Sequence, residues 1–498
     1  MIERSLGYQY LIDKYELTVC ELFVRLYLST ESQKKVIKKD DFQTITVPKA
    51  RVTVADTWQS NLLFAIREEG VNLEVLKAFF KKISVLEITE FLREHPTGAR
   101  HRRIWMLYEN LTGICLDIPD AHSGNYVDLV DRHIQLAVPP QSATRERRYR
   151  VNNNLVGSIG FSPYVRITDE MMTLSSKALK EKSDMILQEY PAELIYRAVQ
   201  YMFVKETKSS FAIERETPTQ KRLESFLRVL REIPDETVTE KLLSSLQNRI
   251  VDSRYAQQAW RTDQVYVGET MTPGYEKVHC IGVQPTDLDD MMHEYLQMVN
   301  NRLEKRDIDA VVLAAIISFA FVFIHPFDDG NGRLHRYLMH YVLSRLGFTP
   351  DDFVFPVSAV LLKKTREYDR MLESFSKRLM AVLDYNVDAN GEVNVLQASD
   401  DFYRYIDYTP IVTRFYAIMD ETIQTEWKIE LDYLKSYDQI RKGMREIVDL
   451  PEKKANQFIV FVRNNNGVLS KTKRDKFSEL TDDEIHALED VIRDGLIK

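Results

Sequence analysis

The stretch IHPFDDGNGRLHRYL, Ile324 to Leu338, concentrates side chains that could do chemistry on a phosphate. His325 can accept a proton near neutral pH, and Asp329 offers the kind of oxygen that Mg²⁺ prefers. Gly330 and Gly332 let the backbone approach an anion because neither carries a Cβ. A base, a metal carboxylate and a bare backbone on one stretch indicate the attack of a hydroxyl on a nucleotide phosphate.

Helical periodicity on both sides places this stretch between two helices. Apolar side chains recur at helical spacing from about Gly332 to Leu346, and the almost wholly apolar run Val311 to Ile324 predicts a buried helix before it. The loop His325 to Asn331 therefore leads into a helix N-terminus, where free N–H groups and the helix dipole favour an anion. Arg333 and Arg336 lie on one face of the second helix and can bind further oxygens.

Simpler interpretations account for these residues taken one at a time. A histidine before proline could be a helix cap, and DDGNGR could be a polar turn. The spacing excludes an EF-hand, and the sequence has no GxxxxGK[ST] phosphate loop. It also has no HExxH, Cys–His cluster or GxSxG motif for zinc or hydrolase chemistry.

The composition predicts a mainly α-helical globular protein of the cytoplasm. Of the 498 residues, 44% are hydrophobic and 29% are charged, and only 17 are Gly and 16 Pro. The net charge of −8 argues against a chain that coats nucleic acid. Cys20, Cys115 and Cys280 are too far apart for a local disulfide framework, which favours a reducing compartment. No signal peptide is expected, and no membrane partner, because the longest apolar run is shorter than the ~20 residues of a span.

Changes of pattern divide the chain into four expected regions. A mixed α/β N-terminal region ends in the linker or surface loop Val151 to Val165, and β-hairpins are expected at Tyr266 to Val283 and at Asn386 to Val395. Within the first region, Phe42 to Val54 alternates like a strand and Asn72 to Leu86 is amphipathic like a helix. The regions are 1–165 (mixed α/β with linker), 166–384 (helical core), 385–455 (helical extension) and 456–498 (a small C-terminal helical module, for which a winged-helix-like fold stays open).

The stretch from His325 to Arg336 resembles the Fic family signature, HPFx[D/E]GNGRxxR, at every specified position. The resemblance covers about residues 180–384 and extends to the flanking regions with less specific motifs. It implies a Fic-type helical core with a β-hairpin flap. It also implies a protein adenylyltransferase, which transfers AMP from ATP to a Ser, Thr or Tyr hydroxyl of a target protein or of the chain itself, with Mg²⁺ as cofactor.

The resemblance further implies a role for each part of the loop. His325 would deprotonate the incoming hydroxyl, and Asp329 would hold Mg²⁺ on the phosphates. Arg336 would contact the nucleotide, and Tyr368, in REYDRML, would lie near the adenine, although a core aromatic fits that position equally well. The anion hole would consist of Gly330, Asn331, Gly332 and Arg333.

The hairpin before the motif would dock the target. Its second strand would pair with the target's backbone, a form of strand addition. His279 and Cys280 are expected to be ordinary strand positions without a catalytic role. The docking residues would be Val278, His279, Cys280 and Ile281.

The segment SSFAIERE resembles the inhibitory helix of many Fic proteins, [S/T]xxxE[G/N]. Ser210 and Glu214 have the required spacing, and Glu214 would pair with Arg336 and displace the γ-phosphate of ATP. Arg215 stands where the family prefers Gly or Asn, and its charge could compete for the same carboxylate. The alternative is an ordinary acidic residue in the first turn of a helix.

Other functions stay open at this point. The same loop could remove AMP from a modified target, or transfer phosphate as in the Doc branch, although Doc-type loops usually have lysine in place of Gly332. A non-enzymatic regulator could bind DNA through the C-terminal module, where Lys471, Lys473 and Arg474 lead into a helix. The acidic chain disfavours that nucleic-acid interpretation. A homo-oligomer is also left open.

Overall fold

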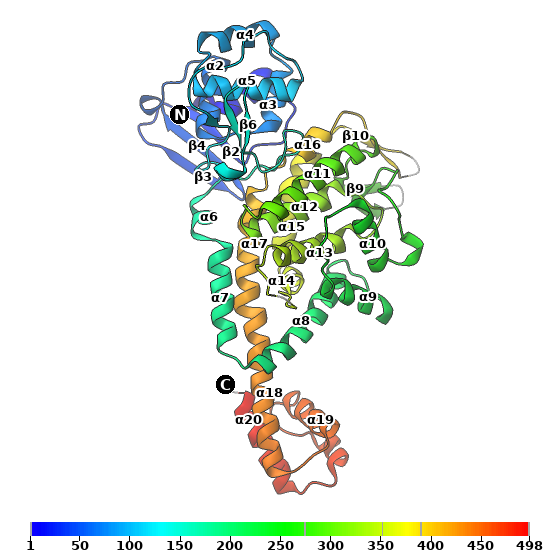
Figure 1. Cartoon of the computed structure of the whole chain (residues 1–498). Coiled ribbons are helices and arrows are strands. Elements are labelled where there is room, and N and C mark those ends of the chain that lie inside the picture. Colours follow the sequence, from blue (N-terminus) through cyan, green and yellow to red (C-terminus); the bar gives the residue numbers. More distant parts are fainter. Residues whose placement is uncertain (1, 273–274, 351, 389–390, 497–498) are drawn as a thin grey trace.

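The computed structural model describes residues 2–272, 275–350, 352–388 and 391–496. Figure 1 shows three parts along one axis: an N-terminal part, a large helical core, and a small C-terminal part at the end of a long helix. Helices dominate and the sheets are small, so the mainly α fold class is confirmed.

The N-terminal part is mixed α/β and has its own apolar core. Its main sheet has the strand order β1-β2-β4-β3, in which β2 and β4 are parallel. The strands are β1 (Ile2–Leu6), β2 (Val24–Ser29), β3 (Lys35–Lys39) and β4 (Phe42–Pro48). The helices are α1 (Gly7–Tyr15), α2 (Trp58–Glu68), α3 (Leu73–Phe80), α4 (Val85–Glu94) and α5 (Ala99–Thr112).

Two elements of this part differ from the sequence-based expectation. The helix expected at Asn72 to Leu86 is two helices, because Ser84 starts α4 with a capping box completed by Glu87. The expected strand Phe42 to Val54 ends at Pro48, which has no N–H to continue the ladder.

The stretch Val151 to Val165 is not a surface loop. After β7 (Val151–Asn153), which pairs with β5 (Val127–Asp128) and β6 (Thr144–Glu146), the chain runs inward, and Phe161 and Val165 are buried. Tyr164 N–H donates to the Ile406 carbonyl at 3.0 Å. The stretch therefore packs between the N-terminal part and the core, because its apolar side chains find cover there.

The core is built around α12 (Ala310–Ile324), which is buried along almost its whole length. It packs against α13 (Asn331–Arg345), and both helices lie within one residue of their predicted bounds. The surrounding helices are α6 (Asp169–Thr173), α7 (Ser176–Gln188), α8 (Ala192–Ile213), α9 (Gln220–Arg231), α10 (Glu240–Ile250), α11 (Pro285–Lys305), α14 (Val357–Lys363) and α15 (Thr365–Met380).

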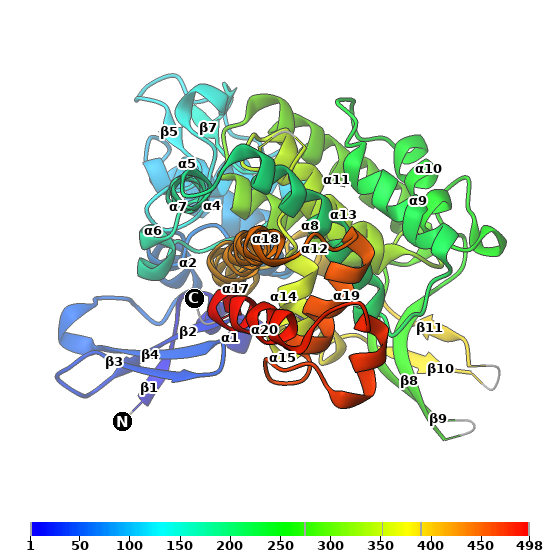
Figure 2. The same ribbon diagram turned by 90° about the horizontal axis from the view of Figure 1, so that it is seen from below.

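Both predicted hairpins are present. Strands β8 (Tyr266–Thr272) and β9 (Tyr275–Ile281) form one, and β10 (Tyr385–Val387) and β11 (Val393–Val395) form the other. Figure 2 shows both hairpins projecting on the same side of the core. The turn residues 273–274 and 389–390 lie outside the described residues.

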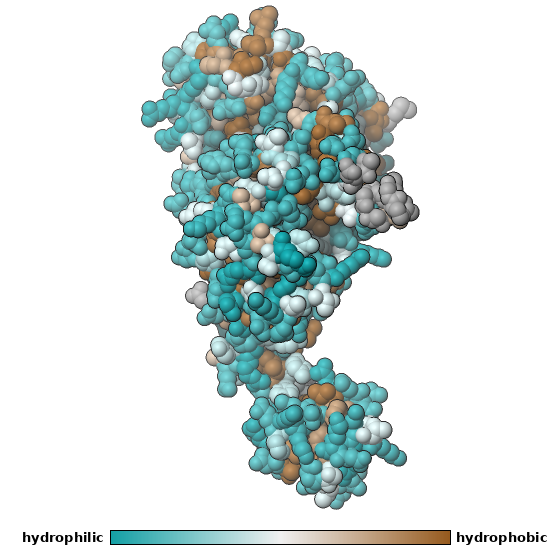
Figure 3. All heavy atoms as spheres, turned by 90° about the vertical axis from the view of Figure 1, so that its right-hand side faces the viewer, coloured by the Kyte–Doolittle hydropathy of each residue, from teal (hydrophilic) through white to brown (hydrophobic). Residues whose placement is uncertain are grey.

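A long helix links the core to the C-terminal part. After α16 (Asp400–Arg404), α17 (Thr409–Glu421) continues through the π-helical segment η4 (Thr422–Trp427) into α18 (Lys428–Ile447). The C-terminal part adds α19 (Glu452–Arg463), the 3₁₀ segment η5 (Lys471–Phe477) and α20 (Asp482–Leu496). Figure 3 shows the narrow waist between this part and the rest.

The C-terminal part has a helical fold without a wing. Its described residues, 428–496, contain no strand. The predicted capping box of Thr481 and Glu484 is formed. The basic cluster supports local structure: Lys473 lies over the Phe461 ring, and Arg474 donates to the Phe477 carbonyl at 2.6 Å. Within the described part of the whole chain, no helix combines the length and apolar character that a membrane crossing requires.

Candidate active site

The loop between α12 and α13 turns through two residues with positive φ. His325 caps the C-terminus of α12 at φ 58° and donates its N–H to the Phe321 carbonyl at 3.0 Å. Gly330 caps the N-terminus of α13 at φ 92°, where a Cβ would also lie 2.7 Å from Val251. A side chain at Gly330 would meet both backbone strain and a steric clash.

Asn331 holds the loop from the inside. The Phe327 N–H donates to Asn331 Oδ1 at 3.0 Å, and Asn331 Nδ2 donates to the Phe327 carbonyl at 2.6 Å. Phe327 is fully buried, with its ring 5.2 Å from that of Trp260. Since the Asn331 amide is occupied by Phe327, only the backbone N–H of Asn331 can serve an anion.

Three residues outside the motif hold the loop from the other side. Gln247 Nε2 donates to the Asp329 carbonyl at 3.1 Å, and Gln257 Oε1 accepts from the Asp328 N–H at 2.8 Å. Arg261, which is 3% exposed, donates to the His325 carbonyl at 2.7 Å and also to the Val283 carbonyl at the end of the flap. Sequence reasoning missed these residues because none of them follows a pattern.

His325 has the form of a neutral base. Its Nδ1 lies 3.1 Å from the Val322 carbonyl, so the tautomer with its proton on Nδ1 donates there and leaves a lone pair on Nε2. Burial, with a smaller contribution from the Arg261 charge, lowers the pKa of His325 to about 4, although the Val322 hydrogen bond, Glu214 and Asp329 oppose this shift. The ring is therefore unprotonated at neutral pH.

The N-terminus of α13 already holds a carboxylate. The first helical hydrogen bond runs from the Leu334 N–H to the Gly330 carbonyl at 2.9 Å. The N–H groups of residues 331–333 precede it and have no helical partner. A Cβ on Gly332 would lie 2.3 Å from Oε1 of Glu214. The Glu214 carboxylate thus lies directly against the backbone of Gly332, at the positive end of the helix.

Glu214 bridges two buried arginines. Its Oε1 accepts from Arg336 at 2.7 Å, and its Oε2 lies 2.9 Å from Nε of Arg333. Arg336 also donates to the Ser210 hydroxyl at 2.7 Å and to the Ser210 carbonyl at 2.8 Å. Both arginines are at most 1% exposed. Ser210 and Glu214 therefore bind the second motif arginine together.

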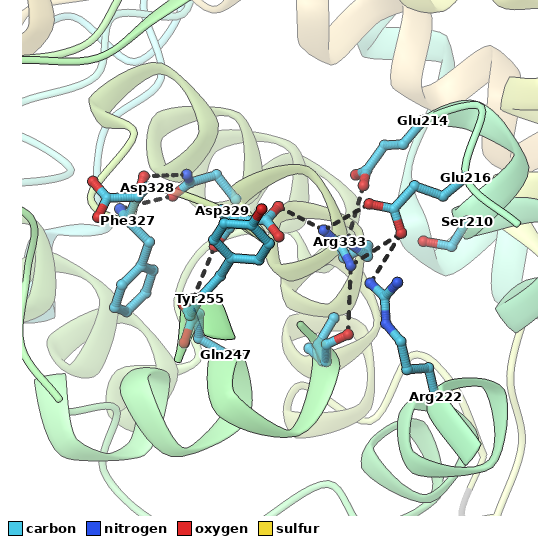
Figure 4. Close-up of polar contacts among 12 residues, drawn as sticks. Ser210, Glu214, Glu216, Arg222, Gln247, Tyr255, Phe327, Asp328, Asp329 and Arg333 are labelled. Carbon is cyan, nitrogen blue, oxygen red and sulfur yellow. Dashed lines mark hydrogen bonds and ion pairs between the residues drawn. The ribbon is translucent and has the colours of Figure 1, made fainter. Parts of the chain in front are cut away.

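Two further carboxylates lie around Arg333. Asp329 Oδ1 accepts from Arg333 at 2.7 Å, and Glu216 Oε1 lies 3.3 Å from the same guanidinium. Figure 4 shows Glu214, Glu216 and Asp329 converging on Arg333 from two elements, the end of α8 and the motif loop. The guanidinium is therefore surrounded by the kind of anionic oxygens that a phosphate would supply.

Residues 237–343 match the family described as Fic/DOC family. This segment is therefore similar to that family. "Protein adenylyltransferase Fic" of Drosophila mojavensis is 36% identical over 91 residues, which are 18% of this chain and 16% of that protein. The protein of the same name from Nematostella vectensis is 30% identical over 120 residues, 23% of this chain and 25% of that protein. The chain thus matches only a quarter or less of the length of these curated relatives.

Solved Fic structures resemble the chain only distantly. A Fic domain-containing signaling protein from Bacteroides thetaiotaomicron is 18% identical, with a TM-score of 0.38, and the match covers 52% of this chain and 96% of that one. A Fic family protein from Desulfovibrio desulfuricans is also 18% identical, with a TM-score of 0.37, and the match covers 58% of this chain and 82% of that one. The similarity to the family therefore rests on the match of residues 237–343 in sequence.

The structure places Glu214 and Arg215 at the C-terminal end of α8. The alternative position of Glu214, in the first turn of a helix, is wrong, because Glu214 is the C-cap of α8. Whether Arg215 weakens the restraint stays open. Its side chain is exposed and forms no ion pair with a described carboxylate. Arg215 lies at φ 56°, the left-handed region that Gly and Asn adopt most easily.

Tyr368 lies inside the helical core. It is 7% exposed on α15, with its ring 6.1 Å from His335 and 6.4 Å from Phe319. Burial raises the pKa of its hydroxyl, and the nearby Arg336 opposes that shift. These contacts are those of a core aromatic that also reaches the second motif arginine, and a role near adenine stays a prediction.

The flap residues occupy different environments along β9. Val278, His279 and Cys280 are half-buried, whereas Ile281 is fully buried and its carbonyl accepts from the Tyr403 hydroxyl at 2.7 Å. Burial raises the pKa of Cys280 to about 12, so its thiol stays protonated and is a poor nucleophile. Ile281, the last residue of β9, is the most buried of these four residues.

Asp329 is the residue of this site best suited to a divalent cation. Its side chain is 35% exposed and lies beside the anion site. Among the described residues, no group of three or more His, Cys, Asp or Glu forms a metal-binding cluster. One carboxylate beside a phosphate site fits Mg²⁺, which takes one or two protein carboxylates and completes its shell with phosphate oxygens and water.

Proposed function

We propose that the chain transfers AMP from ATP to a Ser, Thr or Tyr hydroxyl of a protein target, or of the chain itself. One observation carries this proposal. The loop that starts with the neutral base His325 ends at a helix N-terminus where a carboxylate is already held over Gly332 by Arg333 and Arg336. The match to the Fic/DOC family and the name of its adenylyltransferase relatives support it.

In this mechanism, the residues of the loop move one proton and stabilise one developing charge. Nε2 of His325 takes the hydroxyl proton as the hydroxyl oxygen bonds to the α-phosphorus. The bond from that phosphorus to the bridging oxygen breaks, and pyrophosphate leaves. The N–H groups of Asn331, Gly332 and Arg333 donate to the phosphoryl oxygens as their charge increases.

Mg²⁺ is proposed as the cofactor, held by Asp329. When bound, it would supply positive charge that stabilises the phosphates. Asp329 is oriented by its ion pair with Arg333 at 2.7 Å and by Gln247, which fixes its carbonyl. These contacts direct its carboxylate toward the anion site.

Glu214 is proposed to restrain this reaction. A terminal phosphate and the Glu214 carboxylate need the same donors, Arg336 and Arg333, so they cannot occupy the site together. The hydroxyl and carbonyl of Ser210 hold Arg336 in place for either anion. ATP in its productive position therefore requires Glu214 to leave.

The flap is proposed to dock the target by strand addition. β8 and β9 form a two-stranded sheet, so each strand has an edge that no other described strand occupies. Val278, His279 and Cys280 would contact the target through their backbone. A cytoplasmic location is proposed as well, because the three cysteines are free.

The test is label transfer from α-labelled and γ-labelled ATP with Mg²⁺, using wild type, His325→Ala and Glu214→Gly. The expected result is transfer of the α-label only, lost in the histidine variant and raised in the glutamate variant. Transfer of the γ-label would indicate the phosphotransfer of the Doc branch instead. If no variant transfers either label to proteins of a cell lysate, removal of AMP or a non-enzymatic DNA-binding role replaces the proposal.

A further inference from the structure

Glu216, two residues after Glu214, contacts the first motif arginine. Its Oε1 lies 3.3 Å from NH2 of Arg333, and its Oε2 lies 3.4 Å from NH1. The Glu216 side chain is 32% exposed, whereas that of Arg333 is 1% exposed. Since Arg333 cannot be hydrated by bulk water, each carboxylate around it compensates part of a buried charge.

The end of α8 explains why two carboxylates point in the same direction. The Glu216 N–H donates to the Phe211 carbonyl at 3.2 Å, and the Arg215 N–H donates to the Ala212 carbonyl at 3.0 Å. With Arg215 at φ 56°, this pair of bonds forms a Schellman motif, which folds the chain back over the helix end. Glu214 and Glu216 are thereby placed on the same side, toward α13.

Arg222, on α9, binds Glu216 from the opposite side. Its NH2 donates to Oε2 of Glu216 at 2.9 Å. The guanidinium groups of Arg222 and Arg333 lie 5.3 Å and 5.6 Å from the centre of the Phe211 ring. Glu216 thus bridges two cations that both contact one aromatic ring, and Figure 4 shows it between them.

We propose that Glu216 is a second restraining carboxylate, which competes with nucleotide phosphates for Arg333. Glu214 forms ion pairs with both motif arginines, whereas Glu216 forms ion pairs with Arg333 and with Arg222. Release of Glu214 alone therefore leaves Arg333 partly neutralised. The substrate named here, ATP, rests on the proposed function.

The first test compares Glu216→Gln with the wild-type full chain. Glutamine keeps the size of the side chain and removes its charge, so Arg333 becomes available to phosphate. We expect the KM for ATP to fall by about 3- to 10-fold with little change in kcat, because the lost contact opposes binding. Glu224→Gln is the control: it removes the same charge from an exposed position on α9, where Glu224 accepts from Gln220.

The second variant, Arg222→Gln, should act in the opposite direction. Without Arg222, Glu216 depends on Arg333 alone, and a positive charge near the anion site is lost. We expect the KM for ATP to rise by about 3-fold or more. A merely structural role for both residues predicts a loss of activity in both variants, so the opposite signs separate the two explanations.

A binding measurement separates this inference from the proposed reaction. Mg²⁺-ATP is titrated into the full chain carrying His325→Ala, with and without Glu216→Gln. Tighter binding in the doubly changed chain supports the inference, even if no label transfer is ever found and the adenylyltransferase proposal fails. Equal binding overturns the inference, even if Glu214→Gly raises AMP transfer and the adenylyltransferase proposal stands.

Discussion

Replacement of Arg215 by Asn should strengthen the restraint by Glu214. Arg215 occupies the left-handed position of the α8 Schellman motif, at φ 56°. An ordinary L-residue pays about 1–2 kcal/mol there, whereas Asn pays less because its short polar side chain tolerates this region. The exposed Arg215 side chain contributes no ion pair to any described carboxylate, so the backbone effect dominates.

The expected magnitude follows from that difference. If Asn recovers about 0.5–1 kcal/mol, the end of α8 is held more firmly and the released population falls about 2- to 5-fold. Basal AMP transfer should fall by the same factor. Arg215→Gly should act in the same direction but less strongly, because glycine also gains freedom when the helix end is released.

Initial rates of α-label transfer at limiting ATP provide the assay, with Arg215→Ala as the matched control. Alanine removes the same charge and side chain but keeps the left-handed strain, so its rate should equal that of wild type. If alanine lowers the rate as much as asparagine, the effect comes from the charge of Arg215 and the backbone argument is refuted. Combined with Glu214→Gly, all three changes should lose their effect.

Three other expectations concern the motif loop. Because the pKa of His325 is about 4, the rate of AMP transfer should stay constant from neutral pH down to about 5 and fall below that, where the ring gains a proton. A pH–rate profile in which the rate already falls near pH 6.5 would contradict a buried neutral base. Gly332→Ala should lower the rate of AMP transfer about 100-fold or more, because its Cβ would lie in the anion site, 2.3 Å from the position of the Glu214 oxygen. If the variant folds and binds ATP normally in a titration, the backbone of Gly332 does not form the anion site. Asn331→Ala should lower the free energy of unfolding by about 2–4 kcal/mol, because it leaves the buried N–H and carbonyl of Phe327 unpaired. Urea unfolding measures this change, and an unchanged urea midpoint would mean that water replaces the amide.

Local patterns predicted the helices around the loop well. The apolar run Val311 to Ile324 and the periodicity after Gly332 determined both elements, because α12 and α13 bury continuous faces. The single helix expected at Asn72 to Leu86 was wrong, although the sequence contains a signal for the break. Ser84 and Glu87 form a capping box that splits the helix expected at Asn72 to Leu86, and the apolar periodicity across it concealed the break.

Long-range contacts could not be predicted in the same way. The burial of Val151 to Val165 depends on partners near Ile406, far along the chain. Gln247, Gln257 and Arg261 hold the motif loop through backbone atoms 64 to 82 positions away, and bonds from a side chain to a distant backbone follow no sequence period. The spacing of Ser210 and Glu214 could be recognised, but the conformation of Arg215 required coordinates.

The order of synthesis gives the restraint a consequence for the newly made protein. Glu214 leaves the ribosome 122 positions before Arg336, the arginine that it binds. Translation adds about 5–20 residues per second, so α8 is available seconds before α13 exists. If Glu214 restrains the site as proposed, the restraining residue is therefore already synthesised when α13 completes the anion site.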